Sequence, residues 1–392
     1  SSMPGGYGHG VTVGDVDNDG DPDLFVTRWR SYALYRNNGD GTFEDVTARV
    51  GLDEGRENAK WSFAALGADF DRDGWPDIYV ANDYGSEQLF RNTGEGRFEL
   101  ADADLGKDSK SGMSISLGNL RNDGRWAVFI TNISQRGYIF HGNNLRENRM
   151  DDAGRMVQGS VPSALEDTGW AWGAQFGDLD LDGFQDLVVV NGFISGDPKR
   201  SYWYDAGKLS SGIGGLLADA AYWPAFDGRS QSGYQRTAVL INNGRGGFKN
   251  VATAAGITDL LDGRAVALAD IENDGDLDLL IANQKGPLLC YRNEVEAGER
   301  WIGFELEATR SNRSGIGAEV ELTFDGSRQV QVITGGSGFS SQNDRRVHFG
   351  IGQNAQQLSA IVRWPSGAEQ RLEGLEPGDY VHVVEPASDG ET

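Results

Sequence analysis

The sequence is poor in cysteine, histidine and long apolar runs, and each shortage excludes a class of protein. Its single cysteine, Cys290, cannot form an internal disulfide; it lies in an apolar strand context and is expected to be buried as a small hydrophobe. No apolar run approaches the roughly 18 residues of a transmembrane helix. The four histidines show no HExxH spacing, and neither a Gly-x-Ser-x-Gly elbow nor a complete dinucleotide fingerprint is present. No catalytic motif is therefore recognisable.

Basic residues are also scarce. The 392 residues include 35 Lys and Arg against 59 Asp and Glu, which gives a net charge of -24. A surface of this sign repels phosphate, so we expect no nucleic-acid partner. The length allows two domains, and 56 glycines with only 10 prolines fit a chain with many tight turns.

One acidic loop is abundant and occurs four times. Each copy has acidic residues at positions 1, 3, 5 and 9 and a glycine at position 6, where the chain must bend sharply. Calcium takes about six to eight oxygen ligands, which alternate acids on a tight turn can supply. We therefore predict about four calcium ions. The predicted ligands, position 7 included, are Asp15, Asp17, Asp19, Asp21, Asp23, Asp69, Asp71, Asp73, Trp75, Asp77, Asp178, Asp180, Asp182, Phe184, Asp186, Asp270, Glu272, Asp274, Asp276 and Asp278.

The loops do not continue as EF-hands. An EF-hand needs a glutamate at position 12, where these loops have Val26, Val80, Val189 and Ile281. Short apolar, β-branched runs follow each loop and are typical of buried strands. A hairpin signature with Asn and Gly then follows, as in residues 34–43, 89–98 and 239–248, with a truncated form at 290–293. Each repeat therefore predicts one four-stranded antiparallel sheet.

A fifth repeat is degenerate. Residues 119–127 keep the register of the loop but place Asn119, Arg121 and Ala127 at positions 1, 3 and 9. We predict that this repeat keeps its sheet and has lost its ion, because Arg121 puts a positive charge where a ligand should be. Repeats of about 50 residues with four strands each indicate a β-propeller. An insertion at about 192–235 interrupts the pattern, and its part 207–221 is expected to be helical.

The C-terminal part, 299–386, reads as a run of short strands followed by a tail at 387–392, whereas 1–298 contains the propeller repeats. Two arrangements fit these strands. They can form two further blades and close a seven-bladed ring, which we favour because an open ring exposes strand edges. The alternative is a separate β-sandwich beside a five-bladed ring. In both cases the fold class is all-β, a calcium-binding β-propeller.

These residues resemble known families. The loops in residues 8–293 resemble the FG-GAP or VCBS repeats of integrin α-subunit propellers. Residues 301–385 resemble the ASPIC/UnbV domain, through Thr309-Arg-Ser-Asn-Arg313, Ile316-Gly-Ala318, Gly335-Gly-Ser-Gly-Phe339, Ser341-Gln-Asn-Asp-Arg345, His348-Phe-Gly-Ile-Gly352 and Arg363-Trp-Pro-Ser-Gly367. Together they resemble cartilage-acidic-protein-like proteins. The resemblance implies a secreted, calcium-binding propeller, and the calcium acids alone carry over.

Three functions remain open from the sequence. The first is a secreted, extracellular or periplasmic binding and adhesion module for a glycan or protein partner, since weak calcium loops need abundant calcium. The second is an enzyme, a polysaccharide lyase or hydrolase or a small-molecule cyclase, with its site in the central funnel or at the insertion. The third is a matrix component in which calcium bridges copies. Ligand, reaction and oligomeric state are not specified by the sequence.

Two further groups of residues have alternative interpretations. The aromatic residues of the insertion either stack on a ligand or form a small core of their own; they are Tyr202, Trp203, Tyr204, Tyr222 and Trp223. The polar cluster at residues 341–346 forms either the lip of a ligand pocket or a turn whose Asp and Arg satisfy each other.

Overall fold

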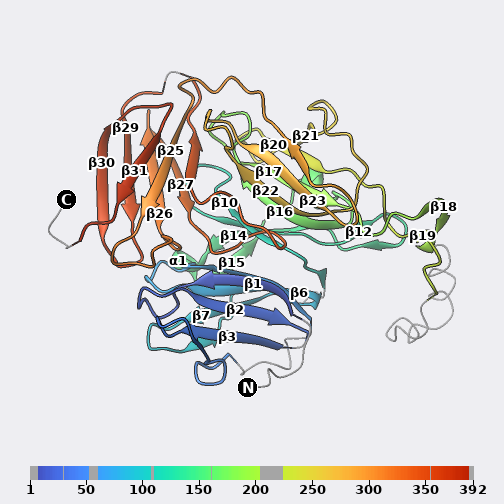
Figure 1. Ribbon diagram of the computed structural model, residues 1–392, viewed down its shortest axis with the longest axis horizontal. Helices are drawn as coiled ribbons and strands as arrows, with labels where there is room; N and C mark the ends of the chain where they lie inside the picture. Colours follow the sequence, from blue (N-terminus) through green and yellow to red (C-terminus); the bar gives the residue numbers. More distant parts are fainter. Residues whose placement is uncertain are drawn as a thin grey trace.

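A computed structural model describes residues 8–29, 31–52, 61–106, 110–159, 161–203, 224–353 and 355–387, and it is an all-β fold of many small sheets. Four sheets have the expected four-stranded meander, and a fifth has three described strands (Figure 1). They comprise β1 (Gly8–Gly14), β2 (Asp23–Arg28), β3 (Ser31–Asn37) and β4 (Phe43–Asp45); β5 (Ser62–Ala68), β6 (Asp77–Gly85), β7 (Gln88–Asn92) and β8 (Phe98–Leu100); β10 (Ile115–Gly118), β11 (Ala127–Ile130), β14 (Asn144–Arg149) and β15 (Arg155–Gln158); β16 (Ala171–Gly177), β17 (Asp186–Asn191), β20 (Ala238–Asn242) and β21 (Phe248–Asn250); and β22 (Gly263–Ala269), β23 (Asp278–Asn283) and β24 (Leu289–Tyr291).

Short strands and two short helices lie outside these meanders. The remaining strands outside the C-terminal part are β9 (Lys110–Ser111), β12 (Ser134–Gln135), β13 (Ile139–Phe140), β18 (Asp197–Ser201) and β19 (Arg229–Ser230). Helices α1 (Met150–Ala153) and α2 (Ser163–Glu166) have four residues each. No helix in the described part of the chain has the length and apolarity needed to cross a membrane.

Consecutive sheets pack face to face, because successive side chains of each second strand point to opposite faces. Ile78 and Val80 of β6 share a core with Phe25 and Leu34 of the first sheet. Tyr79 and Ala81, which alternate with them along β6, instead join the core shared with the third sheet. In the same way, one apolar core is shared by the third and fourth sheets and another by the fourth and fifth sheets. This is the packing expected between propeller blades.

The fifth sheet corrects two expectations. Its described strands end with β24, because the chain leaves the truncated hairpin signature after Asn293 and continues toward Trp301. A fourth strand is therefore not formed where one was predicted. β24 consequently lies at the edge of its sheet, and Cys290 is exposed there rather than buried.

The C-terminal part has two sheets packed around one core, as in a β-sandwich, and not the antiparallel meanders expected of two further blades; the number of blades in the ring stays a prediction. One sheet has the order β28-β25-β31 and the other β27-β26-β29-β30. Both contribute to one shared core that includes Phe304, Val320, Phe349 and Val362. The pairing of β25 with β31 is parallel, whereas successive strands of a blade run antiparallel. The bounds are β25 (Trp301–Glu307), β26 (Glu319–Phe324), β27 (Ser327–Val332), β28 (Val347–Gly350), β29 (Leu358–Arg363), β30 (Glu369–Leu375) and β31 (Tyr380–Val384).

A connection within the sandwich reaches into the centre of the other sheets. We call residues 333–346, between β27 and β28, the axial segment. It contacts the first strand of all five sheets: Val13 donates to the carbonyl of Gly335 (2.8 Å), Gly338 donates to that of Ile115 (2.7 Å), the Gln175 amide to that of Ser337 (3.2 Å), and Leu268 to the Asn343 side chain (3.0 Å). Phe339 stacks on Phe63 of β5 with 5.6 Å between ring centroids. The axial segment thus lies in the space between the innermost strands, where a cavity of about 100 Å³ remains beside Gln175 and Phe176 of β16.

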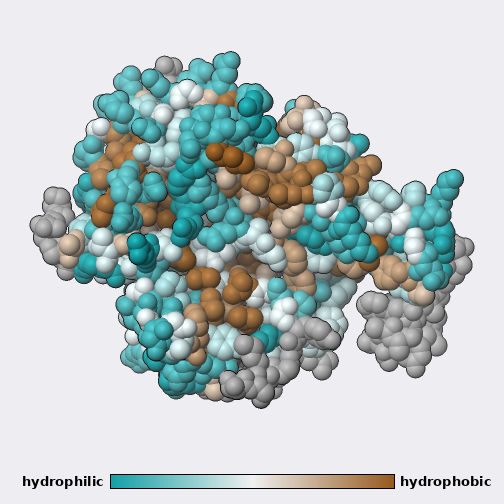
Figure 2. Space-filling model, viewed as in Figure 1, coloured by the Kyte–Doolittle hydropathy of each residue, from teal (hydrophilic) through white to brown (hydrophobic). Residues whose placement is uncertain are grey.

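The sandwich and the insertion lie at opposite ends of the molecule in Figure 1, with β29 to β31 in red on the left and β18 and β19 on the right. The face seen in Figure 2 is largely hydrophilic, as the net charge of -24 leads one to expect, with apolar side chains gathered over β1 and β2, over part of the sandwich and over the region of β17 and β22. Val11 of β1 is 55% exposed.

Candidate metal sites

Each acidic loop is held by hydrogen bonds to its first and last aspartates. In the first loop, Asp15 accepts hydrogen bonds from the backbone N–H groups of Asp19 (3.0 Å) and Gly20 (2.9 Å). Asp23 accepts from Val16 (2.9 Å) and from Asn37 of β3 (2.8 Å). The loops that begin at Asp69, Asp178 and Asp270 repeat all four bonds. The position 9 aspartate therefore ties each loop to the third strand of its own sheet or, for Asp278, to Asn293 just after that strand.

The turn also depends on a left-handed residue that the sequence analysis missed. Position 4 has a positive φ in all five repeats, at Asn18 (54°), Arg72 (60°), Asn122 (54°), Leu181 (59°) and Asn273 (58°). Asparagine tolerates this conformation better than other residues with a Cβ, and it occupies three of the five positions. That enrichment is the sequence signal that could have revealed the turn.

Three of the four intact loops gather carboxylates as a cation requires. One oxygen from each of Asp15, Asp17 and Asp19 lies within 4.8 Å of the others, and the same holds for Asp69, Asp71 and Asp77 and for Asp178, Asp180 and Asp186. In addition, Oδ1 of Asp17 and of Asp71 is buried without a hydrogen-bond partner. Hard carboxylate oxygens of this kind suit calcium. The residues present in these three loops therefore fit the ion.

The fourth intact loop differs from the other three. Glu272 is exposed and lies 4.0 Å from Arg292, and the Tyr380 hydroxyl donates to Oδ2 of Asp270 (3.0 Å). Oδ1 of Asp276 is buried without a partner, so this loop also contains an unsatisfied oxygen. In the degenerate loop, Arg121 turns to Glu147 of β14 (2.7 Å).

The two aromatic side chains at position 7 lie against hairpin turns and not against the carboxylates. Trp75 lies against Gly94 and Phe184 against Gly244, each at the hairpin turn of its own sheet. A Cβ on either glycine would approach the ring within 2.6 Å, so glycine is required at both turns. Of the predicted ligands, Trp75 and Phe184 can offer only backbone oxygens.

The charge of the loops is poorly accommodated without a cation. Burial, with repulsion between neighbouring carboxylates, raises the pKa of Asp15 to about 6 and that of Asp23 to about 7. The same causes raise the pKa of Asp69 to about 6 and that of Asp77 to about 8. A divalent ion opposes both causes, since it attracts the charged form and replaces the water lost on burial.

These pKa values predict how stability depends on pH in the absence of metal. A carboxyl whose pKa is higher in the folded than in the unfolded chain binds more protons when folded, so folding weakens as pH rises. In EDTA we expect the melting temperature to fall as pH rises from about 5 to 8, the window set by the raised values of Asp15, Asp23, Asp69 and Asp77. In saturating calcium the fall should disappear. Melting curves at constant ionic strength test this, and parallel pH profiles with and without calcium would contradict it.

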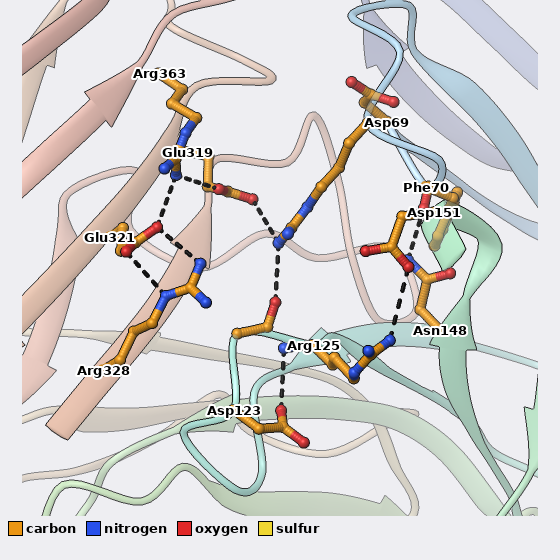
Figure 3. A network of polar contacts seen from close by, with 12 residues as sticks. Asp69, Phe70, Asp123, Arg125, Asn148, Asp151, Glu319, Glu321, Arg328 and Arg363 are labelled. Carbon is orange, nitrogen blue, oxygen red and sulfur yellow. Dashed lines mark hydrogen bonds and ion pairs between the residues drawn. The ribbon is translucent and has the colours of Figure 1, made fainter. Parts of the chain in front are cut away.

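The sandwich covers the acidic loops, which the sequence did not predict. Arg72 of the second loop bonds the carbonyl of Gly124 in the degenerate loop (2.8 Å) and Glu319 of β26 (3.3 Å). Figure 3 shows this junction, where Glu319 and Glu321 also meet Arg363 and Arg328. The sandwich also contacts the loops that begin at Asp178 and Asp270. Arg300 donates to the carbonyl of Asp180 (3.2 Å), Arg346 donates to that of Asp270 (2.7 Å), and His348 forms a hydrogen bond with that of Gly275 (2.9 Å).

The opposite face carries a row of aromatic rings. We call Trp29, Trp61, Tyr84 and His141 the aromatic ladder; the centroid distances along it are 5.4, 5.3 and 6.1 Å. Its members lie where strands of the first three sheets begin or end away from the acidic loops. Trp29 and Tyr84 are 47% and 40% exposed. Beside them, Asp83 has a buried oxygen without a hydrogen-bond partner, and burial raises its pKa to about 7.

The described aromatic residues of the insertion form a core instead of an open surface. Tyr202 is buried and stacks on Phe226 at 4.4 Å. Trp203 packs near Trp170 and donates its indole N–H to Ser232 (2.8 Å). The other three, Tyr204, Tyr222 and Trp223, and the expected helix at 207–221 lie outside the described residues.

Comparisons with known proteins agree with this organisation. Residues 308–390 match the ASPIC and UnbV family, and residues 15–80 and 69–130 each match an FG-GAP-like repeat. Cartilage acidic protein 1 of Xenopus tropicalis is 31% identical over 197 residues, which cover 49% of this chain and 30% of that protein. The Mus musculus protein is 30% identical over 410 residues, which cover 99% of this chain and 55% of that protein. The chain thus spans about half the length of the mouse relative.

Two solved structures are distantly similar to this chain. A structure of an Agrocybe aegerita lectin that recognises non-reducing terminal N-acetylglucosamine has a TM-score of 0.40 at 17% identity, covering 74% of this chain and 67% of the lectin. AofleA from Arthrobotrys oligospora has a TM-score of 0.36 at 10% identity, with 97% and 91% covered. No conclusion about function rests on these likenesses.

Proposed function

We propose that this chain, which carries FG-GAP-like repeats followed by an ASPIC and UnbV domain, is a secreted, calcium-stabilised β-propeller that binds a glycan or protein partner. The filled centre is the observation that carries the proposal. An enzyme in the central funnel needs a ligand-sized pocket between the innermost strands. The axial segment occupies that space and forms hydrogen bonds with the first strands of four sheets, while Phe339 packs on β5, the first strand of the remaining sheet.

Calcium serves a structural role in this proposal. The acidic loops all belong to one end of the sheets, and the sandwich rests on them through backbone carbonyls and side chains of the loops. The axial segment reaches β1 at Gly335 and β22 at Asn343, so we propose that it completes the ring between the first and fifth blades. Weak calcium sites are filled where calcium is abundant, which favours an extracellular or periplasmic location.

The aromatic ladder is the proposed contact surface. Its exposed rings offer flat apolar faces on the side of the molecule that the sandwich leaves free. Trp and Tyr combine large apolar area with a polar group, so they are favoured where a partner with both apolar and polar faces is bound. Sugar rings have this character, and we therefore place a glycan first among the partners.

A glycan array tests this surface. The calcium-loaded wild-type chain is expected to bind a subset of glycans, and a Trp29→Ala, Tyr84→Ala double variant should lose about tenfold or more in affinity, since stacked rings contribute roughly 0.5–1.5 kcal/mol each beyond their buried area. Phe43→Ala is the matched control, because Phe43 is a similarly exposed ring (45%) on β4 of the first sheet. Equal losses in both variants, or no glycan bound by the wild-type chain, would contradict the proposal.

A further inference from the structure

A cavity lies between the sandwich and the end of the axial segment, distinct from the acidic loops and from the aromatic ladder. Its volume is about 400 Å³. This lies within the range of roughly 300–1,000 Å³ typical of small-molecule sites. Its walls come from β25, from the connection between β25 and β26, and from the axial segment. The lining residues that matter are Glu305, Leu306, Arg313, Ser314, Ile333 and Arg345.

Two arginines in this wall are free of partners among the described residues. Arg313 and Arg345 are both exposed, and neither forms an ion pair or a side-chain hydrogen bond with the described part of the chain. The adjacent Arg346, by contrast, is fully engaged: it pairs with Asp344 (2.6 Å) and donates to the carbonyl of Asp270 (2.7 Å).

The charge of the wall favours an anion. The two free arginines contribute +2, and Glu305 contributes -1, because Asp344 is neutralised by Arg346. The local charge is therefore +1 in a protein whose net charge is -24. Guanidinium groups present parallel N–H donors that match the oxygens of a carboxylate, sulfate or phosphate. Ser314 adds a hydroxyl to the same wall.

The rest of the wall indicates an organic molecule. Leu306 and Ile333 line the cavity beside the arginines, so a ligand can bury a carbon skeleton while its anionic group meets the donors. We propose that this cavity binds a small organic oxyanion, with Arg313 and Arg345 as the residues that hold its carboxylate, sulfate or phosphate group. This assigns a ligand-binding role to Arg345 of the polar cluster at 341–346, in which Asp344 and Arg346 satisfy each other.

Calorimetric titration of the full, calcium-loaded chain tests the proposal. The probes are glucuronate, glucose 6-sulfate and glucose 6-phosphate, which differ in the anionic group, with glucose as the uncharged probe. At least one anionic sugar is expected to bind, and glucose should bind about tenfold more weakly or not at all, since hydrogen bonds to charged groups are the strong ones. The best of the three identifies the preferred oxyanion.

Variants decide whether the arginines are responsible. An Arg313→Gln, Arg345→Gln double variant should bind the preferred anion about tenfold or more weakly. Arg371→Gln is the control: it removes the same type of charge from β30, where Arg371 pairs with Glu369 (2.6 Å), and should leave the affinity within about twofold. If the double variant does not fold, Arg345→Lys keeps the charge without the planar donors and should still lose affinity. Unchanged binding in these variants, an equal loss in Arg371→Gln, or failure of the wild-type chain to bind any of the anions would overturn the proposal.

Discussion

Removal of calcium should lower the melting temperature by roughly 10 °C. Three loops fit the ion, and calcium at a hundredfold excess over Kd stabilises the folded chain by about 2.7 kcal/mol for each site, or about 8 kcal/mol together. An unfolding entropy of about 2.1 cal/mol/K per residue converts this free energy to the stated shift for a chain of this length. Differential scanning calorimetry in calcium and in EDTA measures it, and re-addition of calcium should restore the original value.

Magnesium and two matched variants serve as controls. Magnesium demands a tighter octahedral site, so it should stabilise the chain less than calcium. Asp19→Asn removes a carboxylate from one cluster and should lower the melting temperature in calcium by about 3 °C, the loss of one site, with little effect in EDTA. Asp123→Asn changes the same position of the degenerate loop, where the side chain accepts only the N–H of Arg125 (3.0 Å), and should be neutral in both buffers. A melting temperature that EDTA leaves unmoved would remove calcium from the account.

Gly335→Ala should detach the axial segment from the first sheet. A Cβ at this position would lie 1.7 Å from the carbonyl oxygen of Val13, and this neighbour is backbone in a strand, which cannot move aside. The hydrogen bond from Val13 to Gly335 (2.8 Å) would be lost with it. Overpacking of this kind costs about 1–3 kcal/mol. We expect a lower melting temperature and, in limited proteolysis, new cleavage between β27 and β28.

Gly14→Ala is the control for this substitution. Gly14 ends β1 close to the same contact, but a Cβ there meets no atom within 4 Å. The variant should therefore keep both the wild-type melting temperature and the wild-type cleavage pattern. If both variants are cleaved alike, the effect belongs to β1 itself and the axial segment is not the cause.

The local chemistry of the loops could be predicted from sequence because it is contained in consecutive residues. The spacing of Asp15, Asp17 and Asp19, and of Asp178, Asp180 and Asp186, predicts that their carboxylates lie together. The structure brings the same carboxylate oxygens within 4.8 Å of one another. The left-handed turn at position 4 has a weaker sequence signal, the asparagines Asn18 and Asn273, which the sequence analysis did not use. The all-β class and the packing of successive sheets followed from the same repeats.

The C-terminal arrangement could not be predicted in the same way. Alternating apolar residues occur equally in a blade and in a sandwich, so the pattern in β26 and β29 did not distinguish them. What distinguishes a sandwich from a blade here is the parallel pairing of β25 with β31, two strands that are far apart in the chain. Likewise, the exposure of Cys290 depends on a fourth strand that is not formed beside β24, a property of the whole sheet rather than of the residues around the cysteine.

The position of the axial segment in the chain has a consequence for biosynthesis. Phe63 and Trp172 meet Phe339 in the centre of the molecule, yet they leave the ribosome long before it does. Until then the inner rings of the nascent sheets lack this covering partner, and chaperones that recognise apolar surface have time to engage them. A stop codon placed directly after β27, before the axial segment, would therefore release a protein with an uncovered interior, not a shorter version of the same fold.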